Sequence, residues 1–389
     1  MFTDFPAIPV LRACLLDATD APAKQMRAIY YLRSYCLSED KAESDVALST
    51  LIAALGANKD GSALLRHEVA YVLGQIQDAA ACGVLEATLQ DGGDDLMVRH
   101  ECAEALGAIG AERSLVALAA CAADAAEPVE VRETSEIAVN YLRWKLDGER
   151  GVRPPVCACM LSPYSSVDPA PPSADGVERS TEEMHGILAD PAEPLFRRYA
   201  MMFGLRNHFA DAGVECVRAL GEVLAADSSS AVLRHEVAYV LGQMQHPAAV
   251  DALVRALRRD GEHNMVRHEA AEALGAIEGD EAEMELCRAV LREFSEDRDV
   301  VVRESCAVAL DAQDYWNAAG AGGGEGEESG GNGVDGGNES TRVGKEEGER
   351  EGKGAGGAGG GEGEQKVKAG FKHMKEATLP QNHFNVKVN

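Results

Sequence analysis

Four histidine–glutamate pairs are the residues of this sequence whose types and spacing point most directly to chemistry. They are His67–Glu68, His100–Glu101, His235–Glu236 and His268–Glu269. Within each of two sets the pairs lie 33 residues apart, and the second set follows the first at a distance of 168 residues. Imidazole nitrogens and carboxylate oxygens are ligands that divalent iron and zinc take from proteins. The spacing therefore indicates a metal site to which the chain contributes twice.

The pairs belong to a helical sequence that the chain repeats. The segment LLRHEVAYVLGQIQ at 64–77 returns as VLRHEVAYVLGQMQ at 232–245, and MVRHECAEALGAIG at 97–110 returns as MVRHEAAEALGAIE at 265–278. Their apolar residues recur at steps of three and four, as in an amphipathic helix. Another helical run precedes each one, and a polar residue that can cap the second helix lies between the two runs. The expected caps are Ser62, Asp95, Ser230 and Asn264.

Tandem helical hairpins bury their apolar faces by stacking on their neighbours, which predicts an all-α fold, an α-solenoid. Flanking segments fit the same template without the histidine, so we expect eight units in two pseudo-symmetric halves of four. The repeated pattern resembles HEAT repeats. The expected boundaries are 1–146 for the N-terminal half, 147–194 for a linker rich in proline and serine, 195–317 for the C-terminal half, and 318–389 for a largely disordered tail rich in glycine and glutamate.

An arginine precedes each of the four histidines, and it persists where the histidine does not. It is found as Arg66, Arg99, Arg234 and Arg267, and again in outer units as Arg132 and Arg303. We therefore expect the arginine to link adjacent repeats. In those outer units Glu133 and Glu304 replace the histidine. Restriction of the histidines to the central units indicates a site in the middle of the molecule.

Equivalent helices of a solenoid line one surface, with neighbouring axes about 8–10 Å apart. Side chains of two neighbours can then converge, and a pseudo-twofold axis would join the clusters if the halves face each other. The expected clusters are His67, Glu68, His100 and Glu101, and His235, Glu236, His268 and Glu269. Without cations these carboxylates would repel one another, so we expect two divalent metal ions.

Two imidazoles and one carboxylate per ion, with open positions left over, suit non-haem iron(II) and dioxygen chemistry, and zinc remains possible from ligand type alone. Tyr71 and Tyr239 lie one turn after the first and third histidine. They are expected either to donate hydrogen bonds behind the ligands or to be packing residues. Cys157 and Cys159 could also bind a metal, but a single Cys-x-Cys is weak evidence.

The composition limits the class of partner. The net charge is −28, and residues 318–389 contribute little of it, with 12 acidic and 9 basic side chains. An acidic body repels nucleic acids and anionic membranes and attracts a cationic substrate or a basic protein. We see no signal peptide and no apolar run of about 20 residues that would span a bilayer. The ten cysteines are interpreted as reduced thiols, most of them buried, in a cytoplasmic protein.

Four such pairs, two in each half of a HEAT-like chain, resemble the deoxyhypusine hydroxylase family over residues 20–317. The resemblance implies a di-iron monooxygenase that uses dioxygen to hydroxylate the deoxyhypusine side chain of translation factor 5A. It implies that His67, His100 and Glu101 hold one iron(II) ion and that His235, His268 and Glu269 hold the other. It leaves Glu68 and Glu236 as catalytic groups or as carboxylates that bind the amines of the substrate. The internal pseudo-dimer makes a monomer the expected state.

Two alternatives follow from the repeats alone. HEAT chains commonly serve as scaffolds that bind a protein partner without chemistry. A HEAT-like lyase that attaches bilin pigments would also have similar repeats, but it gives the four pairs no evident role. The placement of the histidines favours the enzyme.

Overall fold

The computed structural model describes residues 6–57, 59, 61–152, 162–172 and 177–321. The regular elements among these residues are helices and short 3₁₀ turns, and none of the described residues lies in a β-strand. One set of helices forms an outer layer: α1 (Ile8–Leu16), α3 (Lys41–Ala57), α5 (Cys82–Gln90), α7 (Leu115–Ala123), α9 (Thr181–Ala189), α11 (Val214–Ala226), α13 (Val250–Arg258) and α15 (Glu281–Phe294). The other set forms an inner layer: α2 (Pro22–Cys36), α4 (Ala63–Ile76), α6 (Leu96–Ile109), α8 (Val129–Glu149), α10 (Leu195–Ala212), α12 (Ala231–Met244), α14 (Asn264–Ala276) and α16 (Val300–Ala321).

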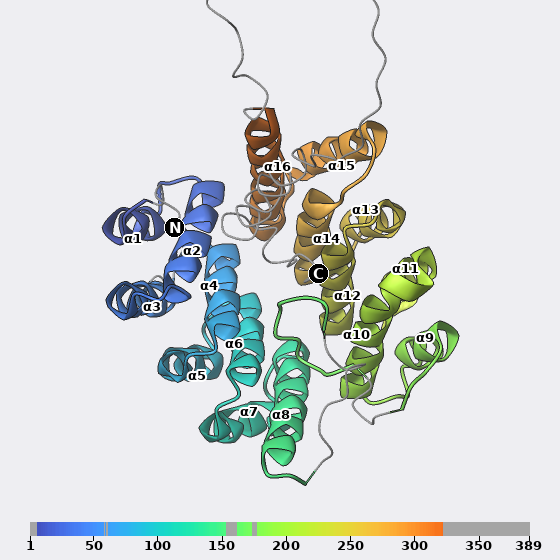
Figure 1. Ribbon diagram of the computed structural model, residues 1–389, viewed down its shortest axis with the longest axis horizontal. Coiled ribbons are helices and arrows are strands. Elements are labelled where there is room, and N and C mark those ends of the chain that lie inside the picture. The colour runs from blue at the N-terminus through green and yellow to red at the C-terminus, as the bar shows by residue number, and fades with distance from the viewer. Residues whose placement is uncertain (1–5, 58, 60, 153–161, 173–176, 322–389) are drawn as a thin grey trace, which may run out of the picture.

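The two layers stack hairpin on hairpin, which confirms the all-α solenoid. Successive inner helices pack against each other, as α4 does on α6 and α12 on α14, and outer helices cover them (Figure 1). Close packing of the inner layer requires glycine. A Cβ at Gly74 would lie 2.8 Å from Cα of Ala105, and one at Gly275 would lie 2.7 Å from Cβ of Ala309. The repeated Leu-Gly pair therefore lets neighbouring inner helices approach each other closely.

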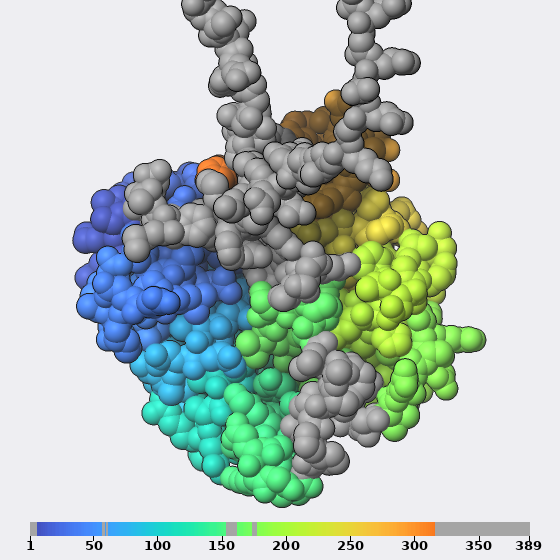
Figure 2. Space-filling model, in the orientation of Figure 1, coloured from blue at the N-terminus to red at the C-terminus, as the bar shows by residue number. Residues whose placement is uncertain are grey.

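The solenoid closes into a ring. Helix α16 packs against α2 and α4, and α8 packs against α10 and α12, so each half contacts the other at both ends (Figure 1). Arg27 of α2 forms an ion pair with Asp311 of α16. Figure 2 shows the first half in blue to cyan and the second in yellow-green to orange, with the green segment between them. The two sets of histidine helices consequently face each other, as the pseudo-twofold arrangement requires.

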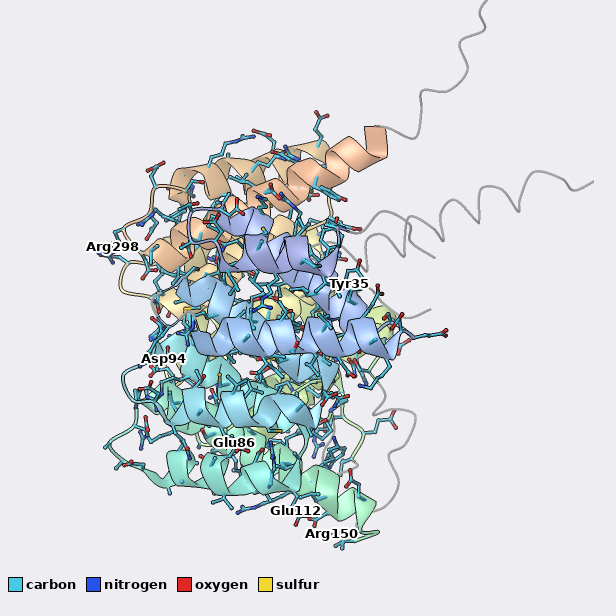
Figure 3. All side chains as sticks on the ribbon, turned by 90° about the vertical axis from the view of Figure 1, so that its left-hand side faces the viewer. Tyr35, Glu86, Asp94, Glu112, Arg150 and Arg298 are labelled. Carbon is cyan, nitrogen blue, oxygen red and sulfur yellow. The ribbon has the colours of Figure 1, made fainter. Side chains whose placement is uncertain are left out.

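Four of the six arginines link adjacent repeats, as predicted, whereas Arg303 donates to carbonyl oxygens of the loop before its own helix. Each of the four that precede a histidine binds a carboxylate in the loop that leads to the next inner helix. The pairs are Arg66–Asp94, Arg99–Glu127, Arg234–Glu262 and Arg267–Asp297, with nitrogen–oxygen distances of 2.5–2.6 Å. These loops lie along one edge of the stack, where Figure 3 shows Asp94 and Arg298, with Tyr35 and Arg150 at the opposite edge. The carboxylates fix the register of one hairpin on the next.

Three of the four expected helix caps are correct. The side chains of Ser62, Asp95 and Ser230 accept hydrogen bonds from backbone N–H groups of α4, α6 and α12. The cap of α14 is His263, whose Nδ1 accepts from the N–H of Met265, and not Asn264, which is already helical. A neutral imidazole nitrogen accepts as an asparagine oxygen would, so the cap fell one residue earlier than expected.

The segment between the halves is partly structured. Residues 181–189, inside the expected linker 147–194, form α9, which packs against α10 and α11 as an outer helix of the second half. Residues 162–172, green in Figures 1 and 2, cross between the halves. The backbone of Val167 bonds to the side chain of Gln75 on α4, and Ser166 accepts from Gln243 on α12. Cys157, Cys159 and the tail from residue 322 lie outside the described residues.

Two smaller expectations concern the rest of the chain. Cys102, Cys216 and Cys306 are free, buried thiols in helices, as expected. Within the described residues, no helix combines the length and the apolar character that a membrane crossing requires.

Candidate metal centre

The four histidines of the repeated pairs meet in the middle of the ring. They come from α4, α6, α12 and α14, and each side chain is almost completely buried. The ring centroids of His67 and His100 are 5.5 Å apart, and those of His235 and His268 are 5.3 Å apart. Across the two halves, His67 lies 5.3 Å from His268, and His100 lies 5.2 Å from His235. The two expected clusters are thus one cluster.

A carboxylate lies between the two imidazoles of each half. Oε2 of Glu101 is 3.2 Å from Nε2 of His67 and 3.8 Å from Nε2 of His100. Oε2 of Glu269 repeats this at 3.3 Å from Nε2 of His235 and 3.8 Å from Nε2 of His268. Glu101 and Glu269 therefore each face both histidines of their own half, in nearly the same geometry.

The donor atoms are close enough to surround cations. Those of His67, His100 and Glu101 lie within 4.8 Å of one another, and so do those of His67, His235 and His268. The first group is the expected set of the N-terminal half. The second joins the two histidines of the C-terminal half to His67, so the halves share one compact set of donors.

The protonation of this cluster suits cation binding. Burial, together with the other three imidazoles, holds the pKa of His100 well below its usual value. Burial also lowers the pKa of His235, although the Glu269 carboxylate acts in the opposite direction. Both rings are therefore neutral at neutral pH, as metal ligands must be. Nε2 of His100 is buried with no hydrogen-bond partner among the described residues, and a metal ion would satisfy it.

The other two glutamates, Glu68 and Glu236, are buried beside the histidines. Glu68 accepts a hydrogen bond from the hydroxyl of Tyr30 on α2. Burial and then the charges of Glu101 and Glu269 raise the pKa of Glu236 well above its usual value. Such a carboxyl gains most from a nearby cation, because a cation favours its ionised form.

A small cavity adjoins the cluster. It is lined by His67, Tyr71, Glu101, Glu104, His235, Glu236 and Tyr239, and the space available to a water molecule is about 10 Å³. The hydroxyl oxygens of Tyr71 and Tyr239 lie 3.1 Å apart across the two halves, and Gln243 donates to Tyr239 at 3.0 Å. The two tyrosines thus have polar contacts at the cavity wall, and their part in the chemistry stays a prediction.

Besides Gln243, five polar residues that the structure describes near the cluster were not expected from the sequence. Tyr30 contacts Glu68, Glu104 lines the cavity, and Thr134, Glu272 and Ser305 lie behind the histidines. The repeat carries a signal for four of them. Glu104 and Glu272 each follow a histidine by four residues on the same helix face. Thr134 and Ser305 each follow the glutamate that replaces a histidine.

Comparisons with known proteins agree with this architecture. Residues 48–140 and 217–311 match the family model of HEAT repeats. The chain is 42% identical to the deoxyhypusine hydroxylase of Chaetomium globosum over 79% of this chain and 88% of that one. It is 44% identical to that of Rattus norvegicus, over 78% and 90%. The structure of human deoxyhypusine hydroxylase in complex with glycerol superposes with a TM-score of 0.67 and 42% identity, covering 79% of this chain and 96% of that chain.

The fold and the buried cluster define a closed HEAT-repeat protein with a candidate metal centre where its halves meet. The number of repeat units, expected to be eight, stays a prediction. The chain belongs to the deoxyhypusine hydroxylase family. It is accordingly an enzyme, a monooxygenase, rather than a scaffold or a bilin lyase.

Proposed function

We propose that this chain hydroxylates the deoxyhypusine side chain of translation factor 5A, with two iron ions as cofactor and dioxygen as co-substrate. The observation that carries the proposal is the meeting of four buried imidazoles and two carboxylates from four inner helices. Membership of the family gives this cluster its reaction.

His67, His100 and Glu101 would hold one iron ion, and His235, His268 and Glu269 the other. When bound, the iron supplies the activation of dioxygen that insertion of an oxygen atom into an unactivated C–H bond requires. The chain itself holds neutral imidazoles in place and surrounds them with buried side chains. Exclusion of bulk water strengthens the electrostatic interactions inside the site.

Glu68 and Glu236 would bind the positively charged amines of the substrate. Glu236 lines the cavity, and its raised pKa reflects burial among other carboxylates. An ammonium group placed there would offset that repulsion and restore the ionised carboxylate. The net charge of −28 favours binding of a substrate whose side chain is cationic and whose surrounding protein surface is basic. The ring closes within one chain, which supports a monomer.

The test is reconstitution of the purified chain with ferrous iron under anaerobic conditions, followed by elemental analysis. We expect about two irons per chain in the wild type and a loss of iron in His67→Ala and His235→Ala. His185→Ala is the matched control, because His185 lies on the outer helix α9 with 30% of its side chain exposed.

The same samples would then act on deoxyhypusine-bearing factor 5A in air, with mass spectrometry of the product. We expect the wild type and His185→Ala to add one oxygen atom to the factor, and His67→Ala and His235→Ala to add none. A folded protein that binds no iron, or one that binds iron without modifying the factor, would overturn the proposed function.

A further inference from the structure

The two halves differ behind their histidines. Nδ1 of His268 lies 3.6 Å from Oε1 of Glu272, and Ser305 donates to the same oxygen at 3.0 Å. Nδ1 of His100 instead lies 3.3 Å from the hydroxyl of Thr134. All five residues are at most 4% exposed. One imidazole therefore has a carboxylate behind it, and its counterpart has a neutral hydroxyl.

Two glutamates with the same local sequence are placed differently in the two halves. Glu104 and Glu272 occupy the same position of the repeat, four residues after His100 and His268. Glu272 is buried beside the His268 ring, whereas Glu104 lines the cavity and is only partly buried. Among the described residues, the one carboxylate within 4 Å of a His100 ring nitrogen is Glu101.

A carboxylate that faces the outer nitrogen of a metal-binding imidazole has two effects. It fixes the tautomer with the proton on that nitrogen, and it makes the other nitrogen a stronger donor. Nε2 of His268 faces Glu269, so Nδ1 is the nitrogen left for Glu272. At 3.6 Å the contact is longer than a hydrogen bond, so the carboxylate acts on the imidazole through its charge. Thr134 carries no charge and has a weaker effect.

We propose that Glu272 is a positioning residue that makes the two metal sites unequal, so that the site of His235, His268 and Glu269 binds a divalent metal more tightly than the site of His67, His100 and Glu101. This rests on the proposed function, because it requires two metal ions. Ser305 holds the Glu272 carboxylate in position, whereas Glu104, at the equivalent place of the repeat, lines the cavity.

The test is a titration of the metal-free, full-length chain with cobalt(II), followed by calorimetry and by the visible absorption of the bound ion. We expect two binding steps in the wild type. His268→Ala should remove the tighter step and His100→Ala the weaker one. Glu272→Gln should weaken the tighter step by roughly 10- to 100-fold and shift its absorption band. Glu104→Gln, the matched variant, should leave the tighter step unchanged.

Two further measurements separate the charge from the fold. A glutamine at 272 can still accept from Ser305, and circular dichroism would show whether the helices are intact. Should Glu272→Gln not fold, Ser305→Ala tests the same idea. This variant keeps the charge of Glu272 but removes the hydrogen bond that holds its carboxylate in position. We expect a smaller weakening of the tighter step.

Two cobalt-binding steps of equal affinity in the wild type would overturn the proposal. A Glu272→Gln variant whose tighter step keeps its affinity would also overturn it. So would a Glu104→Gln variant whose tighter step is weakened as much as that of Glu272→Gln. Such results in an enzyme that still modifies its substrate would leave the proposed function standing. A wild type that binds no cobalt or iron would overturn the metal centre and this inference with it.

Discussion

The hydroxyl of Ser230, the cap of α12, donates a hydrogen bond to Oε2 of Glu133 on α8 at 2.7 Å, and so joins a second-half helix to the first half. Ser62, the cap of α4, donates in the same way to Glu304 on α16 at 2.5 Å. Glu133 and Glu304 occupy the histidine position of their repeats. The template position that supplies the candidate metal donors in the central units thus supplies contacts between the halves in the outer units.

Removal of one of these contacts should destabilise the fold. In Ser230→Ala the N–H of Leu233 loses its cap and Glu133 loses a partner. We expect the free energy of unfolding to fall by about 1–2 kcal/mol, measured by urea denaturation. Ser228→Ala is the control, because Ser228 is exposed in the same loop. Equal stability of the two variants would contradict the role of the cap.

Addition of one methyl group between α14 and α16 should also be destabilising. The Cβ of Gly275→Ala would meet Cβ of Ala309 at 2.7 Å and Cα of Ala309 at 3.1 Å. We expect a loss of about 1–3 kcal/mol from overpacking, seen in thermal or urea unfolding. Gly186→Ala on α9 is the matched control, because its Cβ meets nothing within 4 Å. That variant should gain about 0.5–1 kcal/mol, and a gain in Gly275→Ala would refute the close approach.

The ion pairs between repeats predict a pH dependence of stability. Hydrogen bonds from Arg267 hold the pKa of Asp297 below its usual value of 3.8. A carboxyl whose pKa is lower in the folded chain stabilises the fold above its unfolded pKa, and this contribution is lost as the pH falls through the folded value. The advantage of the wild type over Asp297→Asn in free energy of unfolding should therefore be full at about pH 6 and shrink below about pH 4.

A control for this pH series is Asp251→Asn on the outer helix α13, where the aspartate side chain is 79% exposed. Its difference from the wild type should stay small across the series. An Asp297→Asn difference that does not change with pH would show that Arg267 has no influence on the titration of Asp297.

The glutamates of the site should separate into two classes. Glu101→Gln is expected to lose metal, because Glu101 faces both histidines of its half. Glu236→Gln is expected to keep its metal and to lose roughly 10- to 100-fold in kcat/KM, since a hydrogen bond to a charged group contributes about 1.5–3 kcal/mol. Elemental analysis and the hydroxylation assay distinguish the two. Glu222→Gln, at a position 69% exposed on α11, should change neither.

Loss of metal in Glu236→Gln, or full activity of that variant, would contradict the assignment of Glu236 to the substrate. Full metal content in Glu101→Gln would contradict the assignment of Glu101 as a ligand.

Much of this architecture could be predicted from the repeats. The period of the sequence, the polar caps and the paired residues were enough to predict the helical hairpins, the linking arginines and the convergence of the four histidines. Closure into a ring was not predictable in the same way. The contact of α16 with α2 depends on the curvature that accumulates along the solenoid, and no local pattern encodes it.

Other details depend on tertiary context. Helix α9 is short and follows a segment rich in proline and serine, so the sequence pattern places 181–189 in the linker. Glu104 and Glu272 have the same local sequence, AEALGA, and take different positions because their neighbours differ. A pattern that repeats cannot show where its copies diverge in space.

Because the ring is closed, the distance between the two sets of candidate metal donors depends on every repeat around the ring. An open solenoid can change its curvature or lose an end repeat while the other repeats keep their geometry. Here every contact between inner helices, including those of α8 with α10 and α16 with α2, helps to set the diameter of the ring. A substitution far from the histidines, in any hairpin of the ring, can therefore alter the separation of His67 from His268.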